Sequence, residues 1–332
     1  MATEMKLFEI LDESTQILQK QFEMSYFEAL IESMENILNV QSISENFSTM
    51  DASTVEQLTA LYEKIPADLD PETLRKGVQL ATLKAMKETK VPANQQMTPD
   101  AIGFLVAYLI EIITSVTENE TVHVADLAVG TGNLLYTIHH YLKNKTKAVQ
   151  LTGVDNDELL LALAATSAAF QKTDAQLMLQ DGLRPVLMSP ADVIVSDLPV
   201  GYYPDDEQAK KYNSAFSSGH SYSHYLLMEQ QLHYLKPAHF AFFIVPMQMF
   251  QNAQMNTLLK ALDKQAYIQG IIELPHNLFA NENSRKSIMI LQKHGEQAQP
   301  LETLVAAVPE LKEVESLQNF LTEIIQWKKN NL

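Results

Sequence analysis

The sequence contains no cysteine among its 332 residues. This absence excludes disulfides, thiolate zinc sites and a cysteine nucleophile. Long apolar runs are also missing, since stretches such as 240–246 are far shorter than the roughly 20 residues that cross a bilayer. The first residues show no basic segment followed by an apolar one. We therefore expect a cytoplasmic protein without a membrane partner.

Basic residues are scarce as well, because 24 Lys and Arg stand against 41 Asp and Glu, for a net charge of −17. Phosphate binding draws its free energy from basic residues that displace counterions, so this balance argues against broad attraction to nucleic acid. The acids gather in residues 1–63, which contain twelve of them and only Lys6 and Lys20 as bases. The pairs Lys210–Lys211 and Arg285–Lys286 still allow a local basic face elsewhere.

The first part of the chain has the apolar spacing of amphipathic helices. Leu30, Met34 and Leu38 repeat at intervals of four, and Asp70 followed by Pro71 predicts the cap and first position of a helix that runs to about residue 87. We expect an all-helical N-terminal domain over residues 1–94, joined through the polar segment 91–96 to a second domain over residues 95–332. Packing, self-association or binding of a protein partner is the expected use of the helical domain.

After residue 98 short β-rich runs alternate with helical segments, which is typical of an α/β sheet built from crossover units. Seven candidate strands cover residues 122–126, 149–154, 175–179, 192–196, 239–245, 267–273 and 286–292. The chain between the last two runs is too short for a useful helix, so the seventh strand should run antiparallel to its neighbour.

The first run leads into a loop with two glycines, Gly130 and Gly132, which permit a tight turn and close approach of a ligand to the backbone. A dinucleotide fingerprint needs a third glycine where Leu135 stands, so the sequence disfavours NAD.

Three of the first runs end in acids, Asp126, Asp155 and Asp181. The carboxyl ends of parallel strands meet at one sheet edge, so these carboxylates should gather there. Such a site suits a cofactor with an ammonium and a sulfonium and repels phosphates. Asp155 stands where an acid at the tip of the second strand can accept both ribose hydroxyls. This charge pattern favours S-adenosylmethionine.

Residues from about 95 to 294 resemble the catalytic domain of adenine-specific DNA amino-methyltransferases, especially the modification subunits of type I restriction systems. Gln95, Thr98 and Pro99 are similar to the family's entry segment, and residues 126–135 to its glycine-rich loop. Residues 273–279, Glu-Leu-Pro-His-Asn-Leu-Phe, resemble a further family motif. The resemblance implies a class I methyltransferase with a Rossmann-like, seven-stranded sheet, and DNA as partner.

The resemblance and the glycine loop together give a set of candidate cofactor-binding residues. They are Thr98, Asp126, Ala128, Gly130, Thr131, Gly132, Asn133, Leu134, Asp155, Asn156, Asp181, Gly182 and Asp197. Thr98 is expected to close over the methionine part of the cofactor, although Thr-Pro-Asp in succession also predicts a helix cap at this position.

The fourth run ends in Ser-Asp-Leu-Pro-Val-Gly, residues 196–201, where the family carries Asn or Asp, two prolines and an aromatic. Asp197, Leu198 and Pro199 are the candidate catalytic residues. By resemblance, the Asp197 side chain and the Leu198 carbonyl accept hydrogen bonds from the target amino group. Val200 cannot stack on a flipped base as the family's aromatic does, and Tyr202 and Tyr203 follow as a shifted ring or as ordinary packing residues.

Three functions therefore stay open. The chain is an N-methyltransferase acting on adenine in DNA, a cofactor-binding interaction protein with little catalysis, or a methyltransferase of RNA or of a protein amide. Residues 213–225 are expected to form a mobile loop over the substrate mouth. His220 and His224 within it lack a third ligand at suitable spacing, so we assign no metal.

Overall fold

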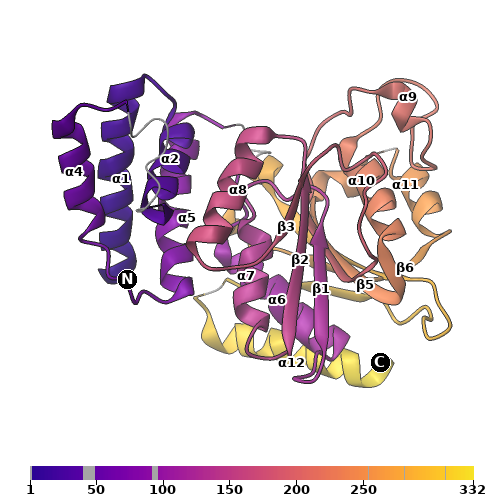
Figure 1. The fold of residues 1–332 in the computed structure, drawn as a ribbon. Helices are drawn as coiled ribbons and strands as arrows, with labels where there is room; N and C mark the ends of the chain where they lie inside the picture. Colours follow the sequence, from indigo (N-terminus) through magenta and orange to yellow (C-terminus); the bar gives the residue numbers. More distant parts are fainter. Residues whose placement is uncertain (1, 40–48, 92–95, 253, 280, 311) are drawn as a thin grey trace.

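A computed structural model describes residues 2–39, 49–91, 96–252, 254–279, 281–310 and 312–332. It has a helical part at the N-terminus and a larger α/β part (Figure 1). The helical part contains α1 (Ala2–Phe22), α2 (Tyr26–Leu38), α4 (Ala52–Tyr62) and α5 (Pro71–Glu88).

Side-chain caps set the starts of three of these helices. The Asp70 carboxylate accepts the Thr73 backbone N–H at 3.0 Å, which confirms the helix predicted from this segment. Asp51 caps α4 in the same way, and Ser25 forms a reciprocal capping box with Glu28 at the start of α2. Apolar residues of α1, α2 and α5, such as Leu11, Leu30 and Ala81, pack into one core. Leu163 of the α/β part belongs to the same core.

The α/β part is built on a mixed sheet in the order β3-β2-β1-β4-β5-β7-β6-β8. The strands are β1 (Thr121–Asp126), β2 (Ala148–Asp155), β3 (Gln176–Leu179), β4 (Ala191–Asp197), β5 (Leu235–Pro246), β6 (Ala266–Glu273), β7 (Lys286–Lys293) and β8 (Leu304–Ala307). β7 runs antiparallel to both β5 and β6, as expected for the last predicted run. The α/β fold class is thus confirmed.

The predicted number of seven strands is wrong, because the sheet formed by the described residues has eight. The additional strand, β8, has four residues and pairs parallel with β6 from Gly270↔Leu304 onward. Its sequence, Leu-Val-Ala-Ala, is too short to show the alternation of buried and exposed positions that identifies a strand.

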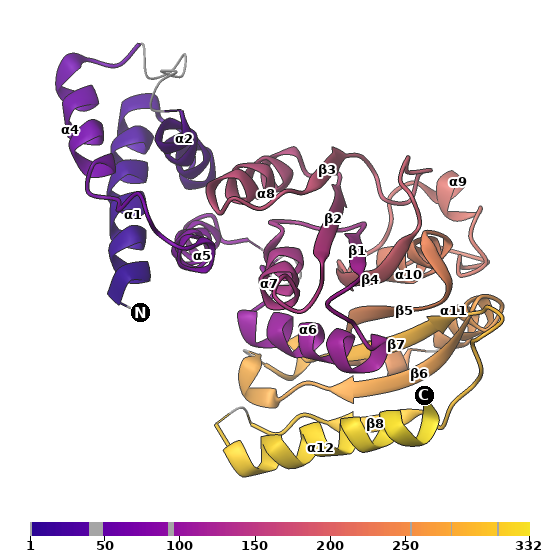
Figure 2. The same ribbon diagram turned by 60° about the horizontal axis from the view of Figure 1, so that its bottom comes forward.

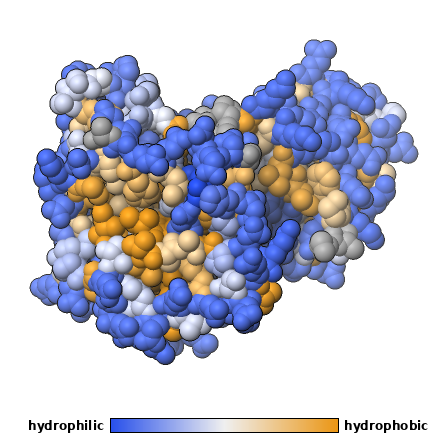
Figure 3. All heavy atoms as spheres, turned by 180° about the vertical axis from the view of Figure 1, so that it is seen from behind, coloured by the Kyte–Doolittle hydropathy of each residue, from blue (hydrophilic) through white to orange (hydrophobic). Residues whose placement is uncertain are grey.

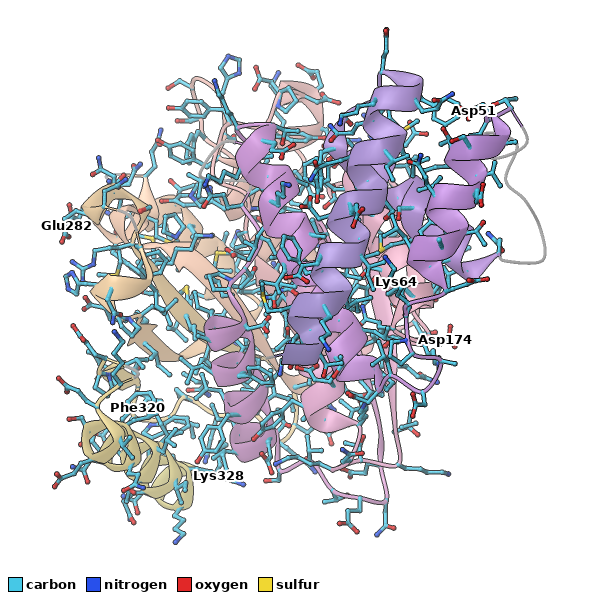
Figure 4. The ribbon with its side chains drawn as sticks, turned by 90° about the vertical axis from the view of Figure 1, so that its left-hand side faces the viewer. Asp51, Lys64, Asp174, Glu282, Phe320 and Lys328 are labelled. Atoms are coloured by element: carbon cyan, nitrogen blue, oxygen red, sulfur yellow. The ribbon has the colours of Figure 1, made fainter. Side chains whose placement is uncertain are left out.

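Helices cover both faces of the sheet (Figure 2). One core contains residues of α6 (Asp100–Thr114), α7 (Asn133–Leu142), α8 (Glu158–Phe170) and α12 (Val314–Asn331), and the other contains residues of α10 (Ser223–His233) and α11 (Met255–Leu262). Phe320 and Lys328, both labelled in Figure 4, lie on α12. Phe320 is buried in the first core. The Lys328 ammonium donates to Ser115 Oγ at the end of α6. Smaller helical segments are α9 (Asp206–Ala209), η2 (Met247–Gln251), η3 (His276–Leu278) and η4 (Glu282–Ser284).

The sequence suggested Thr98 as a helix cap, and this is wrong. α6 begins at Asp100 with Pro99 at the cap position and no side-chain cap bond. The Thr98 hydroxyl donates instead to the Asp197 carboxylate at the end of β4, at 2.8 Å. A tertiary partner thus takes the hydroxyl that a local cap would have used.

Arg75 of α5 joins the helical part to the α/β part. Its guanidinium, 2% exposed, donates to both carboxylate oxygens of Asp100 at 2.9 and 2.7 Å and to both of Glu72 at 2.8 Å. It also donates at 3.2 Å to Asn133 Oδ1 and at 3.2 Å to Thr137 Oγ1, at the start of α7. Burial by itself lowers the pKa of Arg75, but the two carboxylates more than offset this and raise it. One buried cation therefore holds α5, α6 and α7 together.

Seen from behind, the two parts form two masses with a hollow between them (Figure 3). The predicted boundary at residues 94 and 95, and Gln95 of the entry segment, lie outside the described residues. The boundary stays a prediction. No helix in the described part of the chain is long and apolar enough to span a membrane.

We predict that Arg75→Met lowers the free energy of unfolding by about 3 to 5 kcal/mol, because it leaves the partly buried Asp100 and Glu72 without the buried cation that pairs with them. Urea unfolding followed by circular dichroism measures this. Lys84→Met on the same helix is the matched control: its partly exposed pair with Asp12 should contribute only about 0 to 1 kcal/mol. Equal losses in the two variants would contradict the importance assigned to Arg75.

Candidate functional site

The candidate site is a cavity of about 480 Å³ at the carboxyl ends of β1, β2, β3 and β4. The strand order reverses between β1 and β4, and ligands of open α/β sheets bind at such a switch point. Of the residues predicted from the sequence, the following line it: Thr98, Asp126, Ala128, Gly130, Thr131, Asn133, Leu134, Asp155, Asn156, Asp181, Gly182, Asp197 and Pro199. Gly132 and Leu198 are absent from its lining.

The two loop glycines have different surroundings. Gly130 has φ +53°, its N–H donates to Asp155 at 2.7 Å, and a Cβ placed on it would meet no atom within 4 Å. Gly132 has φ +78°, and a Cβ there would lie 2.4 Å from the Tyr136 ring. Tyr136 is buried and donates its hydroxyl to the Ala164 carbonyl, so it cannot easily move. Gly130 thus leaves space in the cavity, whereas Gly132 leaves space for the protein's own core.

Asp126 is buried at the end of β1. Its Oδ1 accepts the Ser196 hydroxyl at 2.6 Å and the Ala128 N–H at 2.9 Å. Burial raises the pKa of Asp126 to about 7, and the nearby charges of Asp155 and Asp197 act in the same direction. A cation bound in the cavity would favour the ionised form of this carboxyl.

Asp155 and Asp181 are held in place by backbone N–H groups. Asp155 accepts the N–H groups of Gly130 at 2.7 Å and of Asp157 at 2.9 Å. Burial raises its pKa despite these hydrogen bonds. Asp181 accepts the Leu183 N–H at 2.9 Å and the Tyr203 hydroxyl at 2.5 Å. The sheet edge therefore carries fixed acceptors on three neighbouring strands.

Asp197, at the end of β4, has a donor on each oxygen. Thr98 Oγ1 donates to Oδ2 at 2.8 Å, and the Lys286 ammonium donates to Oδ1 at 2.6 Å. Leu198 is buried and its N–H donates to the Ile244 carbonyl at 3.1 Å. Pro199 lines the cavity beside them.

Sequence reasoning missed Lys286 and Arg75. Lys286 was noted only as half of a basic pair, and its register opposite Pro246 of β5 is what brings it to the site. Arg75 lies in a helix whose spacing gave no sign of a distant partner. Met86 of α5 also lines the cavity, so the helical part contributes directly to its wall.

The two tyrosines after the β4 motif have separate environments. Tyr203 is buried, lines the cavity and binds Asp181. Tyr202 is 59% exposed and stacks on Tyr222, with ring centroids 4.8 Å apart and planes 10° apart. Tyr202 is therefore a surface aromatic, and Tyr203 is part of the pocket.

The mobile loop predicted over residues 213–225 is too long, and its mobility stays a prediction. Its last three residues belong to α10, and Tyr225 is fully buried. The Glu229 carboxylate accepts the backbone N–H groups of Asn213 at 3.0 Å and Ser214 at 2.7 Å, which fixes the start of the segment. A buried acid in the following helix, whose partners are backbone groups, was not detectable from the sequence.

The two histidines of this segment differ in environment. His224 is buried, and burial lowers its pKa to about 4. His220 is exposed and lies 3.0 Å from Asp206. Within the described residues no group of three or more His, Asp or Glu side chains is arranged to hold a metal ion.

Comparison with known proteins gives two family matches. Residues 83–326 match the N-6 DNA methylase family, and residues 5–86 match the YtxK N-terminal helical domain. The uncharacterized protein YtxK of Bacillus subtilis is 34% identical over 325 residues, which are 97% of each chain.

Solved structures agree with these matches. A Listeria monocytogenes protein, provisionally assigned as a class I S-adenosylmethionine-dependent methyltransferase, is 40% identical, with a TM-score of 0.91 over 98% of this chain and 99% of that one. The type I restriction-modification methyltransferase subunit of Streptococcus thermophilus shares the fold, with 13% identity and a TM-score of 0.60 over 98% and 93% of the two chains.

We predict that Gly132→Ala lowers the free energy of unfolding by about 2 to 5 kcal/mol, from left-handed backbone strain together with overpacking against Tyr136. Gly130→Ala has only the backbone cost of about 1 to 2 kcal/mol, because its Cβ points into open space. Urea unfolding of both variants measures the difference. Equal destabilisation would show that Tyr136 yields to the added methyl group.

A second prediction concerns pH. The pKa of Asp126 is raised from its ordinary value of 3.8 to about 7, so the folded state holds this proton longer than the unfolded state does. Its contribution to stability is therefore complete below about pH 4 and is lost as the pH rises to about 7. We expect the stability of the wild type relative to Asp126→Asn to fall by roughly 1 to 4 kcal/mol over this range. Urea unfolding of both proteins at several pH values tests this, and a constant difference would contradict it.

Proposed function

Because this chain belongs to the N-6 DNA methylase family, with the fold of class I S-adenosylmethionine-dependent methyltransferases, we propose that it transfers a methyl group from S-adenosylmethionine to the exocyclic amino group of adenine in DNA. The observation that carries the proposal is the position of Asp197. It lines the cavity, binds Thr98 and ends β4, the strand next to β1, which ends at Asp126.

The residues present fit the cofactor. The cavity of about 480 Å³ is within the usual range for small-molecule sites. Its acids suit a ligand with an ammonium and a sulfonium, and Gly130 leaves open space above the loop. Asp155 would accept the ribose hydroxyls and Asp181 would face the adenine, while Asp126 and Thr98 would lie at the methionine part.

S-adenosylmethionine supplies an electrophilic methyl group on sulfur and leaves as a neutral thioether. The work of the chain is to orient the nitrogen that attacks it. Asp197 accepts one N–H of the acceptor amino group and the Leu198 carbonyl accepts the other, so that the nitrogen lone pair points into the cavity. The proton released as the nitrogen–carbon bond forms passes along the first hydrogen bond to the Asp197 carboxylate.

A second candidate function is a cofactor-binding protein with little adenine methylation. Two observations favour it: Val200 provides no ring for stacking, and both oxygens of Asp197 already have donors. RNA or a protein amide is a further acceptor class for the same chemistry. We also propose that residues 1–94 form a unit for self-association or for a protein partner, because their acidic surface disfavours DNA.

We predict that Asp197→Ala lowers methyl transfer about 100- to 1000-fold while S-adenosylmethionine affinity changes by less than about threefold, because the side chain orients the acceptor. Incorporation of tritiated methyl groups into single-stranded DNA that contains adenine gives the first value, and calorimetry gives the second. Asp197→Asn keeps one acceptor oxygen and should lose less. Asp174→Ala, an exposed acid outside the cavity (Figure 4), is the control.

Unchanged transfer by Asp197→Ala would remove this residue from the chemistry. Tight cofactor binding by the wild type with no label in DNA would favour the second candidate, and label in RNA or protein under the same conditions would reassign the acceptor.

A further inference from the structure

Lys286 donates to Asp197, the side chain that the acceptor amino group would contact in the proposed reaction. It begins β7, opposite Pro246 of β5, and its side chain reaches past β5 to the end of β4. The Lys286 ammonium lies 2.6 Å from Asp197 Oδ1, and the two side chains are 17% and 12% exposed. Both line the cavity.

The other oxygen of Asp197 accepts the Thr98 hydroxyl at 2.8 Å, so an acceptor amino group has to share one oxygen with Thr98 or the other with Lys286. A hydrogen bond between an ammonium and a carboxylate is roughly twice as strong as one between neutral groups. A neutral amino group therefore competes poorly with Lys286 for Oδ1, and this contact is stronger still where little water reaches it.

Other cations near the site have partners of their own. Arg184, the other cationic side chain in the described lining of the cavity, pairs with Asp205 at 3.1 Å and lies 3.6 Å from Asp181. Arg285, next to Lys286 in the chain, pairs with Glu273 and Glu282. Lys286 is thus the cation placed at Asp197.

We propose that Lys286 determines acceptor specificity: its ammonium blocks Asp197 to a neutral amino group and releases it to an acceptor that brings a phosphate, as a nucleotide does. This inference rests on the proposed function. In this exchange the ammonium moves from the carboxylate to the phosphate, and the neutral amino group of the acceptor takes its place as the donor to Oδ1. The flexible four-carbon stem of lysine permits this movement.

The absence of an aromatic residue at position 200 agrees with recognition of the acceptor by charge. A site with a ring holds the base by stacking, which does not depend on charge. Here the two nearby tyrosines have other partners, since Tyr203 binds Asp181 and Tyr202 stacks on Tyr222. An ionic contact between Lys286 and a phosphate would supply the acceptor affinity that stacking does not.

Adenosine and adenosine 5′-monophosphate test the proposal, because they differ only by the phosphate. Calorimetry is carried out on the full chain saturated with S-adenosylhomocysteine. We expect the wild type to bind the monophosphate about tenfold more tightly than adenosine. Lys286→Met should bind both within about twofold, with adenosine bound more tightly than by the wild type, because Asp197 is free. Lys286→Arg should keep the preference.

Lys293→Met, at the opposite end of β7 and bonded to the carbonyls of His233 and Leu235, is the control and should keep the wild-type preference. An equal preference in Lys286→Met and wild type would overturn the proposal, and so would binding of neither compound by either protein. Binding of S-adenosylhomocysteine, measured first, tests the proposed cofactor site separately, so a failure there is distinguishable from a failure of the Lys286 assignment.

Discussion

The buried guanidinium of Arg75 is the interaction on which the arrangement of the site depends. It belongs to the helical part, yet its partners Asp100 and Asn133 begin α6 and α7 of the α/β part, and Asn133 lines the cavity. Asn133 in turn donates to the Thr98 carbonyl at 2.8 Å, and Thr98 donates to Asp197. A chain of hydrogen bonds therefore runs from α5 to the end of β4. Displacing α5 would disturb the glycine loop, the entry segment and Asp197 together, so the helical part is a structural component of the site.

Ionising the carboxylates of the site is unfavourable, because they are removed from water and lie near one another. Hydrogen bonds from backbone N–H groups offset only part of this cost. Asp126 is buried and Asp155 is partly buried, and removal from water raises the pKa of both. Such groups destabilise the folded state when ionised, and proteins keep them mainly where a ligand makes use of them. A cationic ligand is the natural complement, because it would restore the charge balance that the fold alone leaves incomplete.

The sequence revealed features whose cause is local. Buried strands such as β4 and β5 stand out as apolar runs, and the three strand-end aspartates follow from parallel topology. It did not reveal features that depend on distant partners. Arg75 and Asn133 are 58 residues apart, and Asp197 and Lys286 are 89 apart. The cap predicted at Thr98 failed for the same reason, because local rules do not anticipate a tertiary partner.

The two departures from the family motif at β4 have different physical meanings. Leu198 is buried in the core formed with α10 and α11, so its side chain serves packing, and the carbonyl that the chemistry would use is unaffected by the loss of proline's ring. Val200 bears on the proposed function, because Tyr203 binds Asp181 and Tyr202 stacks on Tyr222 instead of replacing the missing ring. Lys286 brings a charge to the same place. Under the role that we propose for Lys286, the acceptor's charge, more than its ring, is the property that this site would select.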